Sequence, residues 1–496
     1  MPAREEPRWP TLCLGLVCVA YLVAQVAWVG RVPLGWDESV YVSQVDPRLP
    51  ALEFSAPRSR GTSLLVWPVE RLTGSVAALR VYLAVLSSAG LFVAYRVWRP
   101  LADPSVPPVA ALLLTTLWMT LFYGPAAMPN LAVALAAVAA VAWFLQVAAE
   151  PGGRRLERLA LTAALAFAAL LRPGDAAPVV AALTLATLLR REWRGRWRRL
   201  LPPVLGGAAA GVLPWVVEAQ QRYGDVVARA RRALAAQSTG ERFVPDHQLR
   251  ALDGPILCRP CRRAVEAVPL SGLLWWSVAA VLVVAGLLLA RRRHGRLVPL
   301  ALATAVAAFS AGPYLLLVGY AAPRFLLPAY ALLALPVASG LAALVRRVSP
   351  RARPVVVAGV VLVLAVHALA QVRILREITA DQRRDRQTWV AAAAELARLG
   401  VRPPCTLAGS NATPVARVAG CDSVRVRRYR GDEDLSVADL RRRLRSESVA
   451  VLERHGTPPP AWARGWVRPP GGSLPSAADL VVLLPPESMR PPRPSG

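Results

Sequence analysis

The chain has 496 residues, of which 55% are hydrophobic, and its mean hydropathy is +0.40. This apolar content excludes an ordinary soluble domain and indicates a protein that crosses a membrane many times. The formal net charge is +28, and because the chain contains no lysine, all 59 basic residues are arginine. These arginines stand mostly in short clusters between apolar segments, so they do not indicate nucleic-acid binding.

Apolar runs of about 20 residues, the length that spans ~30 Å of hydrocarbon, predict about eleven membrane helices. The first run lacks a small-residue cleavage site after it, so we predict a retained anchor and not a removed signal peptide. The predicted helices begin near residues 11, 76, 105, 128, 157, 176, 201, 269, 297, 325 and 354.

The arginine clusters between these helices predict the orientation. All of them fall on one side of the predicted membrane, and the positive-inside rule makes that side cytoplasmic. One cluster, REWRGRWRR at 191–199, has two tryptophans among its arginines and fits a juxtamembrane helix on anionic lipid headgroups. We therefore predict a multi-pass protein of the cytoplasmic membrane, with a cytoplasmic N-terminus and, given an odd number of crossings, an external C-terminus.

This orientation leaves two external loops and an external tail. The membrane domain is expected at 1–371, with external loops at 31–75 and 218–268. In the tail, strand-like and helix-like patterns replace the apolar runs, which predicts a small α/β domain at 372–485. The Pro-rich stretch 486–496 is expected to be disordered. The predicted fold class is an all-α polytopic membrane domain with a small external α/β domain.

Four cysteines fall in the predicted external regions. Cys405 and Cys421 bracket a strand and a helix of the tail, where a disulfide would persist in an oxidising compartment; two buried thiols are the alternative. Cys258 and Cys261 form a CxxC in the second loop. Zinc would need two further ligands, so a local disulfide is the preferred interpretation, ahead of redox activity.

The stretch GWDESVYVSQVD at 35–46 directly follows the first apolar run. It places two adjacent carboxylates, Asp37 and Glu38, at the mouth of a membrane helix, where ionisable groups are often functional. The structural alternative is a helix start, with Asp37 as the cap, Glu38 adding favourable charge, and Tyr41 on the apolar side of a helix lying on the surface.

Three arginines in the predicted external regions could serve an anionic substrate. Arg58 and Arg60 follow in the same loop, and Arg324 begins a late membrane helix in the sequence RFLLP. Arg324 could instead anchor its helix at the lipid headgroups. Arg172 and Asp175, in LRPGD, are interpreted as a buried ion pair that closes a helical turn.

Together these features resemble the GT-C integral membrane glycosyltransferases, in particular the group of bacterial protein O-mannosyltransferases and aminoarabinose transferases. The resemblance rests on the acidic pair Asp37 and Glu38 after the first helix, the RFLLP motif at 324–328, LRPGD at 171–175 and VLPWVVEAQQRYGD at 212–225. It covers most of residues 10–371, and the order and membrane side of the short motifs carry it.

The resemblance implies transfer of a sugar from a polyprenyl-phosphate donor at the external face. Such a reaction needs a base for the acceptor hydroxyl and positive charge for the departing phosphate. Asp37 is the predicted base, and Glu38 orients its loop or binds the acceptor. Arg324 is the first choice for the phosphate, followed by Arg58 and Arg60. Tyr41 is expected to contact the acceptor or the loop.

One position departs from the family pattern. Family members often carry a second acidic residue at the external end of the third or fourth helix, where this chain has Asn130, in GPAAMPNLAV. Asparagine keeps a carbonyl oxygen but loses the charge, which disfavours a divalent metal that bridges the two loops. We therefore predict no required cofactor and leave a metal open; Asn130 is expected to contact the acceptor or a loop.

The predicted function is a membrane glycosyltransferase of cell-envelope glycan, glycolipid or glycoprotein synthesis, dependent on a polyprenyl-phosphate hexose or pentose. Its expected partners are that donor, membrane lipids and a glycan, lipid or protein acceptor, with no nucleic acid. Two alternatives stay open, a scaffold that keeps the fold without the activity and a lipid or sugar transporter. No inverted repeat is visible in the sequence, which disfavours the transporter.

Overall fold

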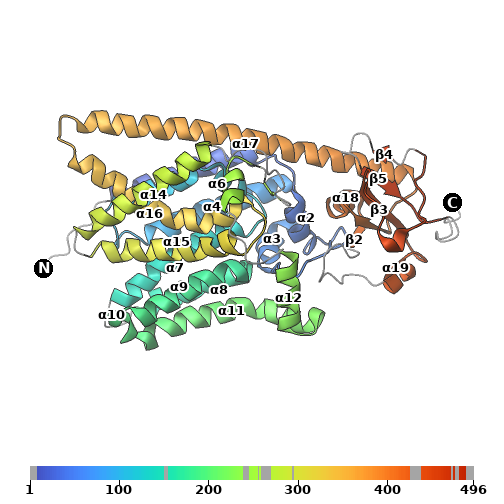
Figure 1. Ribbon diagram of the computed structural model, residues 1–496, viewed down its shortest axis with the longest axis horizontal. Coiled ribbons are helices and arrows are strands. Elements are labelled where there is room, and N and C mark those ends of the chain that lie inside the picture. Colours follow the sequence, from blue (N-terminus) through green and yellow to red (C-terminus); the bar gives the residue numbers. More distant parts are fainter. Residues whose placement is uncertain are drawn as a thin grey trace.

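The computed structural model has an elongated bundle of helices with a small α/β domain at one end (Figure 1). It describes residues 8–149, 155–237, 245–254, 256–258, 270–292, 295–424, 437–470, 473–474 and 480–486. The expected disordered segment 486–496 lies almost wholly outside these residues.

Each of the eleven predicted membrane segments coincides with one helix of the bundle. Among the described residues, eight helices are long and apolar enough to cross a membrane; α5, α8 and α9 are shorter, with 10, 17 and 17 residues. The helical class is thus confirmed, and eleven crossings remain a prediction. The eleven helices are α1 (Trp9–Val29), α4 (Val76–Arg96), α5 (Val106–Thr115), α7 (Asn130–Ala149), α8 (Arg155–Leu171), α9 (Pro173–Leu189), α11 (Trp197–Tyr223), α14 (Leu270–Arg291), α15 (Leu297–Leu316), α16 (Leu327–Arg347) and α17 (Arg353–Arg398).

The packing of the bundle is that of a protein in lipid. Helix α7 is apolar on all sides and almost completely buried, as expected for a central helix, and it packs against α4, α8 and α16. The outer faces of the peripheral helices are also apolar, and side chains such as Leu16 and Val363 are about 70% exposed. Such faces are stable only against hydrocarbon.

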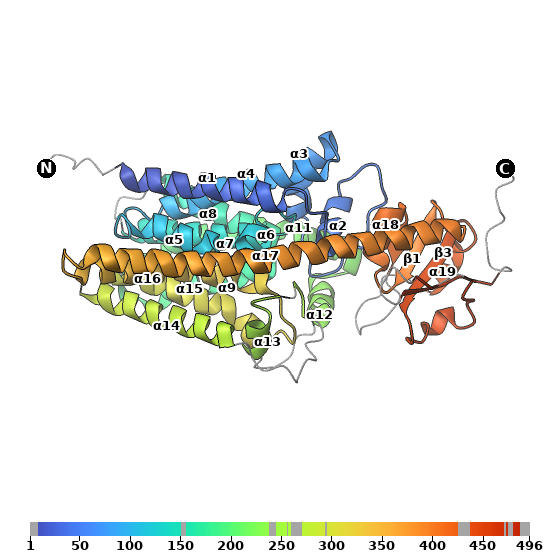
Figure 2. The same ribbon diagram turned by 90° about the horizontal axis from the view of Figure 1, so that it is seen from above.

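Short helices occupy the end of the bundle next to the α/β domain (Figures 1 and 2). They come from the two predicted external loops and from the connections between long helices: α2 (Trp36–Ser43), α3 (Gly61–Leu72), α6 (Trp118–Tyr123), α12 (Val226–Ala236), α13 (Pro245–Arg250) and the 3-10 turn η1 (Pro323–Leu326). Helix α10 (Arg191–Arg194) lies at the opposite end, in the arginine-rich segment. The alternative interpretation of this segment as a helix lying on the surface is wrong, because α2 is buried on most of its sides.

Helix α17 joins the bundle to the α/β domain. It has 46 residues and runs along the length of the molecule, so the predicted boundary at residue 371 falls within one continuous helix (Figure 2). Its last turns pack against α18 (Ala412–Ala419). The α/β domain is therefore held by a rigid element and not by a flexible linker.

The α/β domain has a five-stranded mixed sheet in the order β2-β1-β3-β5-β4. Strand β1 pairs in parallel with β2 and β3, whereas β5 pairs antiparallel with β3 and β4. This sheet confirms the small α/β domain expected from the sequence. Its elements are β1 (Cys405–Gly409), β2 (Asp422–Val424), α19 (Val437–Arg443), β3 (Ser448–Arg454), η2 (Ala461–Ala463), β4 (Ser473–Leu474) and β5 (Leu480–Leu483), together with α18.

A disulfide links Cys405, at the start of β1, to Cys421, just before β2, with 4.8 Å between the Cα atoms. The pairing closes the β1–α18–β2 unit at its base. The other expected pair includes Cys261, which lies outside the described residues; Cys258 forms an antiparallel bridge with Ala321.

Replacing both Cys405 and Cys421 by serine is expected to destabilise the α/β domain by about 3 kcal/mol, because a loop of about 15 residues is no longer closed in the unfolded chain. Chemical denaturation followed by the fluorescence of Trp462 and Trp466, which pack together in this domain, would measure the loss. Reductant should destabilise the wild type equally and leave the double variant unchanged. A variant as stable as the wild type would contradict the prediction.

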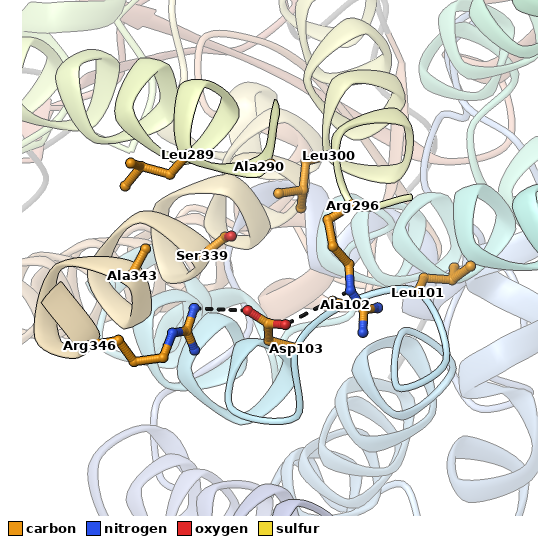
Figure 3. A pocket seen from close by; sticks show the side chains of 10 residues that line it. All are labelled: Leu101, Ala102, Asp103, Leu289, Ala290, Arg296, Leu300, Ser339, Ala343 and Arg346. Carbon is orange, nitrogen blue, oxygen red and sulfur yellow. Dashed lines mark hydrogen bonds and ion pairs between the residues drawn. The ribbon is translucent and has the colours of Figure 1, made fainter. Parts of the chain in front are cut away.

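An ion-pair cluster closes the opposite end of the bundle (Figure 3). Asp103, in the turn between α4 and α5, receives a hydrogen bond of 2.8 Å from Arg346 of α16 and lies 3.8 Å from Arg296 at the start of α15. The cluster fastens three helix ends together. Helix α4, which is about 30 Å long, separates this cluster from the short helices around Asp37.

Candidate active site at the α/β-domain end of the bundle

Helix α2 determines where the two adjacent carboxylates lie. It starts after Gly35, whose backbone is extended, and the Gly35 N–H donates to Glu38 Oε2 at 2.8 Å. Glu38 therefore caps the helix from its third position, as in a capping box. The structural alternative, in which Asp37 is the cap, is therefore wrong, and Asp37 interacts with groups outside α2.

Asp37 lies between two arginines from distant parts of the sequence. Arg58 binds Oδ1, and Arg324, on η1, donates to Oδ2 at 3.1 Å. The two arginine side chains are 12% and 7% exposed, whereas Asp37 is 32% exposed. The most accessible group of the trio is thus the carboxylate, and the trio carries a net positive charge.

The electrostatics keep Asp37 ionised. Burial alone would raise the pKa of this carboxyl, but the charges of Arg58 and Arg324 outweigh burial and hold the pKa below its usual value. An anion that engaged the same guanidinium groups would weaken this hold. The carboxylate would then become a stronger base at the moment a phosphate binds.

Other contacts hold Arg324 in the site in addition to its ion pair with Asp37. Its guanidinium donates to Tyr123 Oη and to the Ile256 carbonyl, both at 3.3 Å, and no described residue accepts from its buried Nε–H. Arg58 donates to Ser55 Oγ at 2.7 Å and lies over the Tyr41 ring. Tyr41 is 5% exposed, so the ring against which Arg58 packs is itself held in the protein interior.

Glu38 makes a second, separate ion pair inside the protein. Arg80 of α4 binds both carboxylate oxygens of Glu38, and both side chains are almost completely buried. The Ala127 N–H donates to Oε1 at 2.8 Å, and Gln382 of α17 donates to Oε2 at 3.3 Å. With both oxygens engaged, Glu38 fixes the position of α2 and has no free lone pair directed at a substrate.

Arg60 is not brought to Asp37. It donates to Glu218 Oε1, at the end of α11, from Nε at 2.9 Å and from Nη2 at 2.6 Å, and to Gln44 at 2.6 Å. The buried Arg229 of α12 binds the other oxygen of Glu218 at 2.9 Å. This second cluster joins the two predicted external loops beside the Asp37 trio.

Asn130 is the first residue of α7 and is fully buried. Among the described residues, neither its amide nitrogen nor its carbonyl oxygen has a hydrogen-bond partner. A buried amide without a partner costs free energy, so the contacts of the described residues do not explain this residue.

The donor set around Asp37 does not fit a divalent cation. Both carboxylate oxygens are paired with guanidinium groups, and within the described ranges no three His, Cys, Asp or Glu side chains lie together. Calcium and magnesium prefer several oxygen ligands, which this arrangement does not supply. We therefore derive no step through a metal.

Several residues of the site were missed from the sequence. Arg80 carried a signal, since a charged residue within an apolar helix usually has a buried partner. Tyr123 and Gln382 carried none, because they are common residue types in unremarkable contexts. Arg172 was interpreted only as the partner of Asp175, yet its charge also acts on Asp37.

Comparisons with known proteins identify the fold. No protein-family model and no curated protein matches the sequence. ArnT from Cupriavidus metallidurans, bound to undecaprenyl phosphate, matches with a TM-score of 0.65 and 16% identity over 98% of this chain and 99% of that one. Its apo form gives the same TM-score at 15% identity.

A more distant match is the archaeal oligosaccharyltransferase AglB from Archaeoglobus fulgidus, in complex with an inhibitory peptide and a dolichol-phosphate. Its TM-score is 0.54 and its identity 12%, over 90% of this chain and 69% of that one. At these identities the likeness concerns the fold, and it extends over the bundle and the α/β domain together. The chain therefore has the GT-C fold expected from its sequence motifs.

Proposed function

We propose that the chain is a membrane glycosyltransferase that transfers a sugar from a polyprenyl-phosphate donor to an acceptor hydroxyl on the external side of the cytoplasmic membrane. The observation that carries the proposal is the Arg58–Asp37–Arg324 trio, in which a partly exposed carboxylate lies between the buried guanidinium of Arg324 and the largely buried guanidinium of Arg58. The solved structures with the same fold hold undecaprenyl phosphate or dolichol-phosphate, which supports this class of donor.

An apolar groove supports a lipid-linked donor. It has a volume of about 720 Å³ and is walled by α8, α9, α11 and α15, with Pro173 and Ala176 at one end and Leu188 near the other. Its lining is mostly alanine, valine and leucine, which suits an isoprenoid chain. Pro173 follows Arg172 directly, so a chain in this groove would place its phosphate beside the Asp37 trio.

In the proposed reaction, Asp37 takes the proton of the acceptor hydroxyl as the acceptor oxygen forms its bond to the anomeric carbon of the sugar. The bond from that carbon to the phosphate oxygen breaks, and the electron pair leaves with the polyprenyl phosphate. Arg324 and Arg58 stabilise the charge that develops on the phosphate. Glu38, held by Arg80, keeps α2 and therefore Asp37 in place.

The orientation follows from the same proposal. The arginine clusters at the end opposite the site face the cytoplasm, and the α/β domain with its Cys405–Cys421 disulfide faces an oxidising compartment. Transfer of labelled sugar from a panel of polyprenyl-phosphate donors by the purified protein tests the function. Absence of transfer from every donor, with donor binding retained, would favour the scaffold.

Replacing Arg324 by glutamine is expected to weaken binding of undecaprenyl phosphate by about 10- to 100-fold, because a charge-assisted hydrogen bond to the phosphate is lost. Native mass spectrometry of the purified protein would measure it. The matched control is Arg346→Gln, which alters an arginine of the opposite end of the bundle (Figure 3). Equal affinity of Arg324→Gln and wild type would remove Arg324 from the donor site.

A further inference from the structure

We infer that Arg172, Asp175 and Tyr314 form a subsite that binds hydroxyl groups of the donor sugar. This inference rests on the proposed function. Arg172 precedes α9, Asp175 lies in its first turn, and Tyr314 lies on α15. In the sequence, Arg172 directly precedes Pro173 and Asp175 directly precedes Ala176, and both Pro173 and Ala176 line the apolar groove.

The aromatic ring of Phe325 joins this group to the Asp37 trio. The guanidinium carbons of Arg172 and Arg324 each lie 5.4 Å from the centre of the Phe325 ring. Tyr314 stacks on the same ring with 4.4 Å between centroids. Arg172, Arg324 and Tyr314 are therefore neighbours around one side chain, although 152 residues separate the first two in sequence.

The hydrogen bonds within the group are incomplete. Tyr314 Oη donates to Asp175 Oδ1, Arg172 Nε lies 3.0 Å from the same oxygen, and Arg172 Nη2 donates to Tyr314 Oη at 3.2 Å. Asp175 Oδ2 is buried and has no hydrogen-bond partner in the part of the chain that the structure describes. Arg172 has five N–H donors, and these contacts engage only two of its nitrogens.

The unpaired groups determine the chemistry of a ligand. Asp175 Oδ2 only accepts, and the remaining Arg172 donors only donate. A phosphate would pair with Arg172 but be repelled by Asp175, and a cation would pair with Asp175 but be repelled by Arg172. A neutral ligand with adjacent hydroxyl groups satisfies both, because each hydroxyl donates and accepts. The stacked rings of Tyr314 and Phe325 add an apolar wall for sugar carbons.

The subsite therefore adds recognition of the sugar to recognition of the phosphate. A site that pairs buried polar groups with substrate hydroxyls discriminates strongly, because a substrate that lacks the hydroxyl leaves those groups unpaired. Sugar selectivity would reside in Asp175 and its partners, whereas Arg58 and Arg324 would bind the phosphate of any polyprenyl-phosphate donor.

The test compares two kinds of lipid on the full-length protein. Native mass spectrometry measures binding of undecaprenyl phosphate and of undecaprenyl phosphates that carry glucose, mannose or ribose. We expect the wild type to bind at least one sugar-bearing lipid about tenfold or more tightly than the bare lipid. Asp175→Asn should abolish this preference and keep the affinity for the bare lipid, and Tyr314→Phe should reduce the preference. Thermal unfolding confirms that each variant is folded.

Asp103→Asn is the matched control, since it alters a paired, mostly buried aspartate at the opposite end of the bundle and should keep the preference (Figure 3). The subsite is overturned if Asp175→Asn and Tyr314→Phe keep the wild-type preference, if Asp175→Asn weakens both kinds of lipid equally, or if the wild type shows no preference. A wild type that binds neither kind of lipid would overturn the proposed function, and the subsite with it.

Discussion

Asp37→Asn is expected to lower the rate of sugar transfer by about 10²- to 10⁴-fold, the usual contribution of a positioned base. Asparagine keeps the size of the side chain and a carbonyl oxygen for Arg324, but it cannot take the proton of the acceptor. Binding of undecaprenyl phosphate should therefore be retained. Single-turnover transfer of labelled sugar, with donor binding measured in parallel, separates the two effects.

The control for this variant is Asp381→Asn, which alters an exposed aspartate of α17 that pairs only with Arg384 among the described residues. The pH profile adds a second check. Because Arg58 and Arg324 hold the pKa of Asp37 below its usual value, protonation of Asp37 should cause no loss of kcat/KM between about pH 5 and 8. Equal transfer by Asp37→Asn and wild type would end the assignment of Asp37 as the base.

Arg80→Met is expected to destabilise the protein by about 3–5 kcal/mol, because it leaves the buried carboxylate of Glu38 without its partner. The double variant Arg80→Met with Glu38→Gln should recover much of the loss, since it buries no uncompensated charge. Thermal unfolding in detergent would measure both. A single variant within about 1 kcal/mol of wild type would show that the pair is not needed for stability.

The same pair predicts how stability depends on pH. Burial raises the pKa of Glu38, but Arg80 and the N–H donors of Gly35 and Ala127 outweigh burial and lower it. The stabilisation is therefore complete above the pKa of the unfolded chain, about 4.3, and is lost as the pH falls through the lower pKa of the folded state. Glu38→Gln should lose this acid-dependent component.

The membrane fold was predictable because hydropathy is a local property. Apolar runs about 20 residues long located all eleven helices, and an acidic pair after the first of them located Asp37. The partners of these residues were harder to predict. Glu38 is bound by Arg80, 42 residues away, and by Gln382, 344 residues away, and no periodicity connects such positions. The two partners of Asp37 were named beforehand as phosphate-binding candidates: Arg58 from the same loop, and Arg324, 287 residues away, through the RFLLP motif.

The sequence also did not predict which residue of each pair in this loop would face the site. Asp37 and Glu38 are adjacent, and consecutive positions on a helix point in different directions, so one carboxylate meets Arg58 and Arg324 while the other meets Arg80. Arg58 and Arg60 are likewise two positions apart and bind different acids, Asp37 and Glu218. Which residue of each pair faces the site depends on the local backbone conformation, which the sequence pattern does not determine.

Because α17 is one continuous helix, its length determines how far the α/β domain lies from the membrane. A helix of 46 residues is about 69 Å long at 1.5 Å per residue, more than twice the thickness of the hydrocarbon. If α17 crosses the membrane, about half of the helix therefore extends beyond the hydrocarbon layer. Gln382 in this part of α17 donates hydrogen bonds to Glu38 and to the Pro33 carbonyl, and these bonds hold the helix against the loop that carries Asp37. The length of one continuous helix therefore fixes the distance between the α/β domain and the bundle.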